Sequence, residues 1–128
     1  MIRDIDLVDV QTQVAKTLSG GQKRKLSVGC AMIGNSKIVI LYEPTSGMDT
    51  SSRRRLWEML KENKHGRIVI LTTHYMDEAE RLFKSIIMLN HGKIVVKGDI
   101  SDVLGGQYKR GINEARSLEE IFLDMVKK

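Results

Sequence analysis

The sequence contains very little cysteine, proline or aromatic residue: one Cys, one Pro and 5% Phe, Trp and Tyr in 128 residues. A single cysteine cannot form a disulfide within the chain, which excludes the disulfide-stapled scaffolds of small secreted domains. Cys30 lies in the apolar stretch 28–33, so we expect it to be a small core residue. The absence of a second cysteine fits a protein from a reducing compartment. The remaining composition, 41% hydrophobic and 29% charged, is that of a folded domain.

Long apolar runs are also missing. None approaches the ~20 residues that span a bilayer, and Met1–Asp4 provide neither a basic nor an apolar signal-peptide region. We therefore expect that no segment of this chain crosses a membrane or directs export.

Basic residues outnumber acidic ones, 21 to 16, and gather at 23–25, 53–55 and 127–128. Such an excess is compatible with nucleic acid, an anionic membrane or a phosphorylated ligand. Single-strand binding surfaces interleave aromatic side chains with the charge, which this sequence does not do. We therefore interpret Arg53–Arg55 as a solvated helix face and expect no nucleic-acid partner.

Four short apolar runs, at 38–41, 68–71, 86–89 and 94–96, predict strands. The first two do not alternate with polar residues, which is typical of parallel strands buried on both faces, and the segment between them can hold a crossover helix. Only residues 90–93 separate the last two runs, which predicts a hairpin. These runs favour an α/β fold with a βαβ unit.

Helix signals fill the intervals. Good N-cap types at 49–51 predict a helix that ends before Gly66 and places Leu56, Met59 and Leu60 on its inner face. A further helix is expected at 20–33, where Leu26, Gly29, Cys30 and Ile33 occur at helical spacing. Two more helices are expected at 76–83 and 118–126. Residues 105–111 are expected to form a loop.

Three polar segments lie at helix starts or strand ends. Ser19-Gly20-Gly21-Gln22 begins a helix whose free N–H groups and dipole suit phosphate, although a simple turn and cap is the commoner explanation for such a fragment alone. Glu43 ends a strand at a sheet edge where it can act as a general base for water, or remain a solvated carboxylate. His74 follows the next strand and could contact the same bound group, although a lone histidine there is more often structural.

Together these segments resemble the ATP-binding-cassette (ABC) transporter family. Residues 18–22 are similar to its signature motif, 38–43 to the Walker B strand with its following glutamate, 46–49 to the D-loop and His74 to the switch histidine. The segments 23–27, 44–49 and 72–79 are similar to the A subfamily of eukaryotic lipid exporters and to related drug and lipid exporters. The resemblance covers about residues 1–100 and rests on four motifs in the family's order.

The resemblance implies the C-terminal portion of a P-loop NTPase (ABC ATPase) fold, with parallel strands, helices on both faces and a terminal hairpin. Residues 1–104 would form that portion and 105–128 a C-terminal loop and helix. The implied cofactors are ATP and Mg²⁺, and the implied partners are a second nucleotide-binding domain, transmembrane domains and the N-terminal half of the same domain. The implied location is the cytoplasmic face of a membrane. ATP hydrolysis would there drive the export of a substrate, and a lipid is the substrate class that the resemblance implies.

The family's division of labour assigns a role to each matching residue. Ser19, Gly20, Gly21 and Gln22 would close over the γ-phosphate of ATP held by a partner domain. Glu43 would activate water, His74 would contact the γ-phosphate, and Asp49 would carry signals between the two sites.

Two departures limit these implications. No G-x-x-x-x-G-K-[ST] phosphate loop (Walker A) occurs in the sequence, since Gly92-Lys93 is followed by Ile94. Tyr42 stands where Walker B has a magnesium-binding aspartate, and a neutral phenol is a poor ligand for a hard cation. A gene fragment, a truncated product and one piece of a split domain all remain open. The main functional hypothesis is a subunit that hydrolyses ATP. The alternative is a degenerate cassette that completes a partner's ATP site, and a soluble ABC protein acting on nucleic acid is a weaker third hypothesis.

Overall fold

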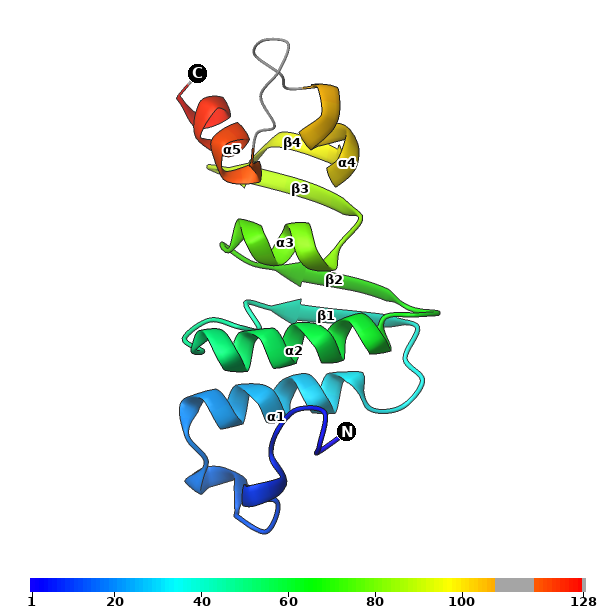
Figure 1. Ribbon diagram of the computed structural model, residues 1–128, viewed down its shortest axis with the longest axis vertical. Helices are drawn as coiled ribbons and strands as arrows, with labels where there is room; N and C mark the ends of the chain where they lie inside the picture. Colours follow the sequence, from blue (N-terminus) through cyan, green and yellow to red (C-terminus); the bar gives the residue numbers. More distant parts are fainter. Residues whose placement is uncertain (108–116, 128) are drawn as a thin grey trace. The chain divides into compact units, whose positions relative to one another are not determined.

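A computed structural model describes residues 1–107 and 117–127 and divides the chain into two compact units, Met1–His74 and Tyr75–Lys128. Figure 1 traces the elements along the chain. The first unit contains η1 (Val8–Val10), η2 (Ala15–Thr17), α1 (Gly20–Met32), β1 (Ile38–Tyr42), α2 (Thr50–Asn63) and β2 (Ile68–Thr72). The second contains α3 (Met76–Leu82), β3 (Ser85–Asn90), β4 (Lys93–Asp99), α4 (Ile100–Asp102), η3 (Val103–Gln107) and α5 (Leu118–Val126).

The first unit is built on a βαβ motif, as predicted. β1 and β2 pair in parallel, with Ile38 opposite Ile68 and Tyr42 opposite Thr72. α2 forms the crossover between them, and α1 and α2 lie on the same side of the strand pair (Figure 1). Parallel pairing brings the carboxyl ends of both strands to one edge, which positions the residues that follow them.

The burial of β1 and β2 differs from the prediction. β1 alternates strictly, with Val39 and Leu41 buried on one face while Ile40 is 70% and Tyr42 81% exposed on the other. β2 alternates between exposed residues, such as Ile70 at 50%, and residues that are only partly buried. The expectation of strands buried on both faces is therefore wrong for this unit, because α1 and α2 cover only one face.

α1 begins and ends where the sequence predicted but turns a different face inward. Its buried residues are Lys25, Val28, Gly29 and Met32. Cys30 is exposed and Ile33 is 63% exposed, so their assignment to the core is wrong.

The N-terminal segment explains this rotation of α1. Ile5 and Leu7 are buried, and a Cβ atom built on Gly29 would lie 2.7 Å from Ile5 Cδ1. That separation is shorter than real carbon contacts, so a side chain at position 29 would displace the end of the Ile5 side chain.

Asp6 links the N-terminal segment to both helices. Its Oδ2 lies 3.2 Å from Lys25 Nζ on α1 and 2.6 Å from Arg55 Nη1 on α2. The hydrogen bond from Lys25 is the main cause that holds the pKa of the Asp6 carboxyl below its ordinary value of 3.8, with a further contribution from Arg55.

Asp6→Asn is expected to reduce the part of the free energy of unfolding that is lost when the pH falls into the acidic range. Because the folded-state pKa is lowered, the contribution is present above about pH 4 and is lost as pH falls through the folded value. Asp6 is half exposed, so the loss should stay below ~1 kcal/mol. Urea unfolding between pH 2 and 7 measures it, with the exposed Asp9→Asn as control; equal curves for both variants would contradict the prediction.

α2 agrees closely with its prediction. It begins after Asp49 and buries Leu56, Met59 and Leu60, as expected, together with Trp57. Arg53 lies with its guanidinium carbon 5.0 Å from the centre of the Trp57 ring. The helix face at 53–55 is therefore only partly solvated, because Arg53 stacks on an aromatic ring and Arg55 pairs with Asp6.

The second unit contains the predicted hairpin and C-terminal helix. β3 and β4 pair antiparallel, joined by a turn at His91 and Gly92, which both have positive φ. α3 ends one residue before the prediction, and α5 has its predicted bounds, with Ser117 forming a capping box. The core of this unit consists of Ala79, Met88, Val96, Ile100, Val103, Leu118 and Ile121.

The loop expected at 105–111 is described only up to residue 107. Residues 105–107 belong to the helical turn η3, so the expectation is wrong there, and 108–111 lie outside the described residues. In the described part of the chain, no helix has both the length and the apolar character that a membrane span requires. The functional division at residue 104 stays a prediction.

Candidate functional site

Glu43 and His74, which follow β1 and β2, meet at the shared edge of the sheet. Glu43 Oε2 lies 2.9 Å from His74 Nδ1, a hydrogen-bonding distance. The Glu43 side chain is 23% exposed and the His74 side chain 62%, so the pair opens to solvent on the histidine side. The structure therefore joins the two residues that the sequence proposed as catalytic.

The backbone of Glu43 is unusually constrained. Its φ of 44° lies in the left-handed region, which costs a non-glycine residue roughly 1–2 kcal/mol. Its N–H continues the ladder to Thr72 O at 3.0 Å and lies 3.2 Å from Thr72 Oγ1. Strain of this kind persists only where neighbouring contacts hold it, and it is frequent at functional sites.

Ser19 and Gln22 close the first turn of α1 as a capping box. The Gln22 N–H donates to Ser19 Oγ at 3.2 Å, and the Ser19 N–H donates to Gln22 Oε1 at 2.9 Å. No atom lies within 4 Å of a Cβ position built on Gly20 or Gly21. A ligand can therefore approach the first-turn N–H groups closely, as the phosphate hypothesis requires.

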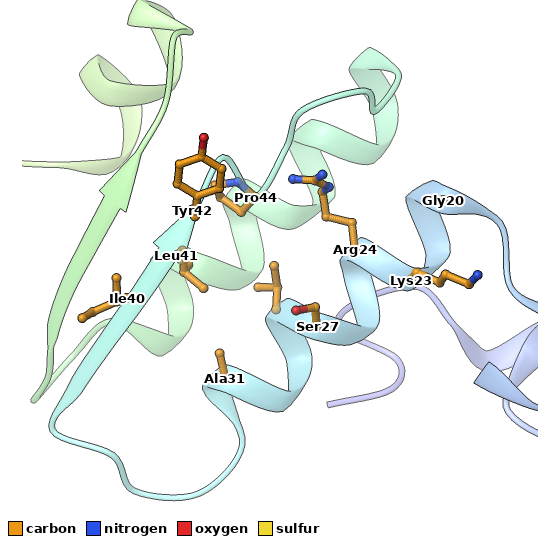
Figure 2. A pocket seen from close by; sticks show the side chains of 10 residues that line it. Gly20, Lys23, Arg24, Ser27, Ala31, Ile40, Leu41, Tyr42 and Pro44 are labelled. Atoms are coloured by element: carbon orange, nitrogen blue, oxygen red, sulfur yellow. The ribbon is translucent and has the colours of Figure 1, made fainter. Parts of the chain in front are cut away.

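A hollow of about 530 Å³ lies between α1 and the end of β1. Figure 2 shows Arg24 and Ser27 on its helix side and Ile40, Tyr42 and Pro44 on its strand side. The Tyr42 ring projects from the strand end and is 81% exposed. Within the described residues, no neighbouring helix therefore covers this ring.

Asp49 caps α2. Its Oδ1 accepts from the Ser52 N–H at 2.8 Å, and Ser52 Oγ donates to its Oδ2 at 3.1 Å. The Ser52 backbone hydrogen bond, followed by the hydroxyl, keeps the pKa of the Asp49 carboxyl below its ordinary value. Asp49 thus has a structural role, and the signalling role implied by the resemblance stays a prediction.

The residues at this edge do not fit a Mg²⁺ site. Position 42 offers a phenol, and the Glu43 carboxylate already contacts His74. Within residues 1–107 and 117–127, no group of three or more His, Cys, Asp and Glu side chains could hold a metal ion.

Sequence reasoning missed two residues of the site, Arg24 and Thr72. Arg24 Nη1 donates to the Glu43 carbonyl oxygen at 2.5 Å, and Thr72 binds the Glu43 N–H through its carbonyl and hydroxyl oxygens. No local pattern marks Arg24, because Lys23-Arg24-Lys25 is a run of like charges. The position of Thr72 opposite Tyr42 could have indicated its role once the parallel register was known.

Comparison with known proteins places these features in a family. The family model described as ABC transporter matches residues 1–46. "ABC transporter A family member 5" of Dictyostelium discoideum is 50% identical over 98 residues, which are 77% of this chain and 6% of that protein. "Phospholipid-transporting ATPase ABCA3" of Rattus norvegicus is 48% identical over 94 residues, 73% of this chain and 6% of that protein.

A solved structure agrees with these relatives. The "Structure of ATP binding subunit of ABC transporter" has a TM-score of 0.81 and 28% sequence identity, and the match covers 98% of this chain and 51% of that one. The chain thus spans about half of this neighbour and a small fraction of the curated relatives. These matches, with the α/β architecture and the joined Glu43 and His74, show that the chain belongs to the ATP-binding domains of the ABC transporter family and is similar to members of sub-family A.

Proposed function

We propose that this chain supplies parts of the ATP-hydrolysing sites of an ABC transporter: Glu43, as the general base, with His74 in one site, and the signature cap at Ser19–Gln22 in the site of a second domain. The observation that carries the proposal is the 2.9 Å contact between Glu43 Oε2 and His74 Nδ1 at the carboxyl ends of two adjacent parallel strands. Ligands of open α/β sheets bind at this edge.

The geometry supports distinct roles for the two residues. Glu43 has one oxygen on His74 and a second oxygen that can accept the proton of an attacking water. His74, more exposed than Glu43, orients that carboxylate through Nδ1, and in its imidazolium form it can also donate from Nε2 to a phosphate oxygen. Water activation and orientation of the terminal phosphate would thus come from one hydrogen-bonded pair.

The phosphates of ATP would be held largely by another polypeptide segment. The sequence contains no G-x-x-x-x-G-K-[ST] loop, and the anion-binding feature that the described residues offer, the start of α1, would serve the ATP of a second domain. We call the missing part the Walker A half: the portion of a sub-family A ATP-binding domain that carries this loop and precedes the signature motif. It is the first partner we propose for this chain, and the exposed side of β1 and β2 is a surface it could cover.

The further partners are a second nucleotide-binding domain and transmembrane domains, at the cytoplasmic face of a membrane. Within this assembly, the N–H groups at the start of α1 would close over ATP held by the second domain, and hydrolysis would drive export. One relative is described as phospholipid-transporting, which supports a lipid as the cargo class.

The alternative is a degenerate cassette that completes a partner's ATP site without hydrolysis. Tyr42 favours it, because the exposed phenol gives Mg²⁺ no anionic ligand. A nucleic-acid role has less support, since Arg24, Lys25, Arg53 and Arg55 all have partners inside the fold.

Isothermal titration with ATP tests the proposal. The chain alone should show no micromolar site, because a helix start without a phosphate loop and its lysine provides few contacts to the β- and γ-phosphates. Addition of the Walker A half should create such a site. A one-site micromolar dissociation constant for the chain alone would contradict the proposal, as would a stable complex of the two parts that fails to bind ATP.

A further inference from the structure

The carbonyl group of Glu43 is held from two directions. Arg24 Nη1 on α1 donates to it at 2.5 Å, and the Ser46 N–H donates to it at 3.2 Å. A hydrogen bond from a charged donor is roughly twice as strong as a neutral one. Since the Arg24 contact is also partly buried, it is the stronger of the two restraints on this carbonyl.

The restraint acts on a strained residue. The N–H side of Glu43 is fixed to β2 through Thr72, whereas its carbonyl side leaves the strand with a left-handed φ of 44°. Release of the carbonyl would allow the backbone to relax toward the favoured φ region. That rotation would redirect the Cα–Cβ bond of Glu43 and move its carboxylate relative to His74. A small displacement would break their hydrogen bond, since its 2.9 Å length requires close alignment of the two groups.

The three consecutive cations of α1 are not equivalent. Lys23 is exposed, and Figure 2 shows it pointing away from the strand end, whereas Arg24 reaches toward it. Lys25 is buried and pairs with Asp6. Only the middle residue of this run contacts Glu43 among the described interactions.

We propose that Arg24 is the positioning residue for Glu43: its guanidinium holds the Glu43 carbonyl so that the carboxylate meets His74. The role rests on the proposed function of Glu43 as the base. It implies that a displacement of the signature helix α1 would be transmitted to the base through a single side chain.

The test uses the whole chain labelled with [¹⁵N]histidine and observed by NMR above neutral pH. The chain has three histidines, and His65 and His91 are exposed and serve as internal references. The hydrogen bond made by one ring nitrogen determines which nitrogen carries the proton. In the wild type we expect His74 to carry it on Nδ1, facing Glu43, and Glu43→Ala establishes the signal obtained without a side-chain acceptor at position 43.

Arg24→Met should remove the Nδ1–H signal of His74 and leave those of His65 and His91 unchanged. Lys23→Met, which removes the same charge from the adjacent position, should keep the signal, and Arg24→Lys should restore part of it. Backbone amide spectra verify folding; if Arg24→Met unfolds, the shorter and neutral Arg24→Gln takes its place with the same expected loss. A retained Nδ1–H signal in a folded variant without arginine at position 24 would overturn the positioning role.

Failure of the underlying function gives a different result. If the wild type and Glu43→Ala have identical His74 signals, the contact between Glu43 and His74 is absent in solution, and both the positioning role and the proposed pairing of Glu43 with His74 are wrong. If these two differ but Arg24→Met resembles the wild type, only the role of Arg24 is wrong.

Discussion

Glu43→Gln should lower ATP hydrolysis by roughly 10²- to 10⁴-fold in a cassette assembled from this chain and the Walker A half, the range for loss of a positioned general base. The amide keeps the size of the side chain and can still hydrogen-bond to His74, but it cannot accept a proton from water. ATP binding should therefore survive while turnover is lost. Steady-state hydrolysis and isothermal titration on the same samples separate the two effects.

The matched control for this variant is Glu58→Gln. Glu58 is an exposed carboxylate on α2, in the same unit, and its replacement removes the same charge. It should leave both turnover and ATP binding unchanged. If Glu43→Gln retained wild-type turnover, another group would have to activate the water, and the base assigned here would be wrong.

Tyr42→Asp should raise Mg²⁺-dependent hydrolysis by roughly 10- to 100-fold in the same assembled cassette, the effect expected of a group that orients a metal. The substitution places an anionic oxygen next to Glu43, at the position where the family's Walker B motif has aspartate. Tyr42 is 81% exposed in the chain alone, so the substitution should alter the stability of the isolated chain by no more than about 0.5 kcal/mol.

The rate and the thermal midpoint should be measured together, with Tyr42→Phe and the double variant with Glu43→Gln as controls. Tyr42→Phe should change neither quantity, because it supplies no ligand. The double variant should be inactive, since the metal ligand cannot replace the base. A folded Tyr42→Asp variant with unchanged Mg²⁺ dependence would show that tyrosine at this position is not what limits hydrolysis.

The elements of the fold could be predicted because their signals are local. Short apolar runs located the four strands of the described residues, and capping residues such as Ser19 and Asp49 located helix starts. The same logic placed Glu43 and His74 at one sheet edge, since parallel pairing alone brings the ends of β1 and β2 together.

The faces of those elements depend on contacts distant in sequence. The burial of Lys25 in place of Cys30 follows from the packing of Ile5 against Gly29, which helical spacing alone cannot reveal. The exposed face of β1 likewise reflects which helices cover the sheet rather than the apolar character of Ile40. Arg24 was missed for the same reason, because its contact with Glu43 joins residues 19 positions apart.

The proposed function requires that this chain carries the general base of an ATPase site, and the signature motif for the site of a second domain, but not a phosphate loop. Its most direct test is the rate of ATP hydrolysis by the chain, by the Walker A half and by their purified complex. We predict that neither part hydrolyses ATP alone and that the complex shows turnover that Glu43→Gln removes. Hydrolysis by the chain alone, or a complex that binds ATP but has no turnover even with Tyr42→Asp, would contradict it.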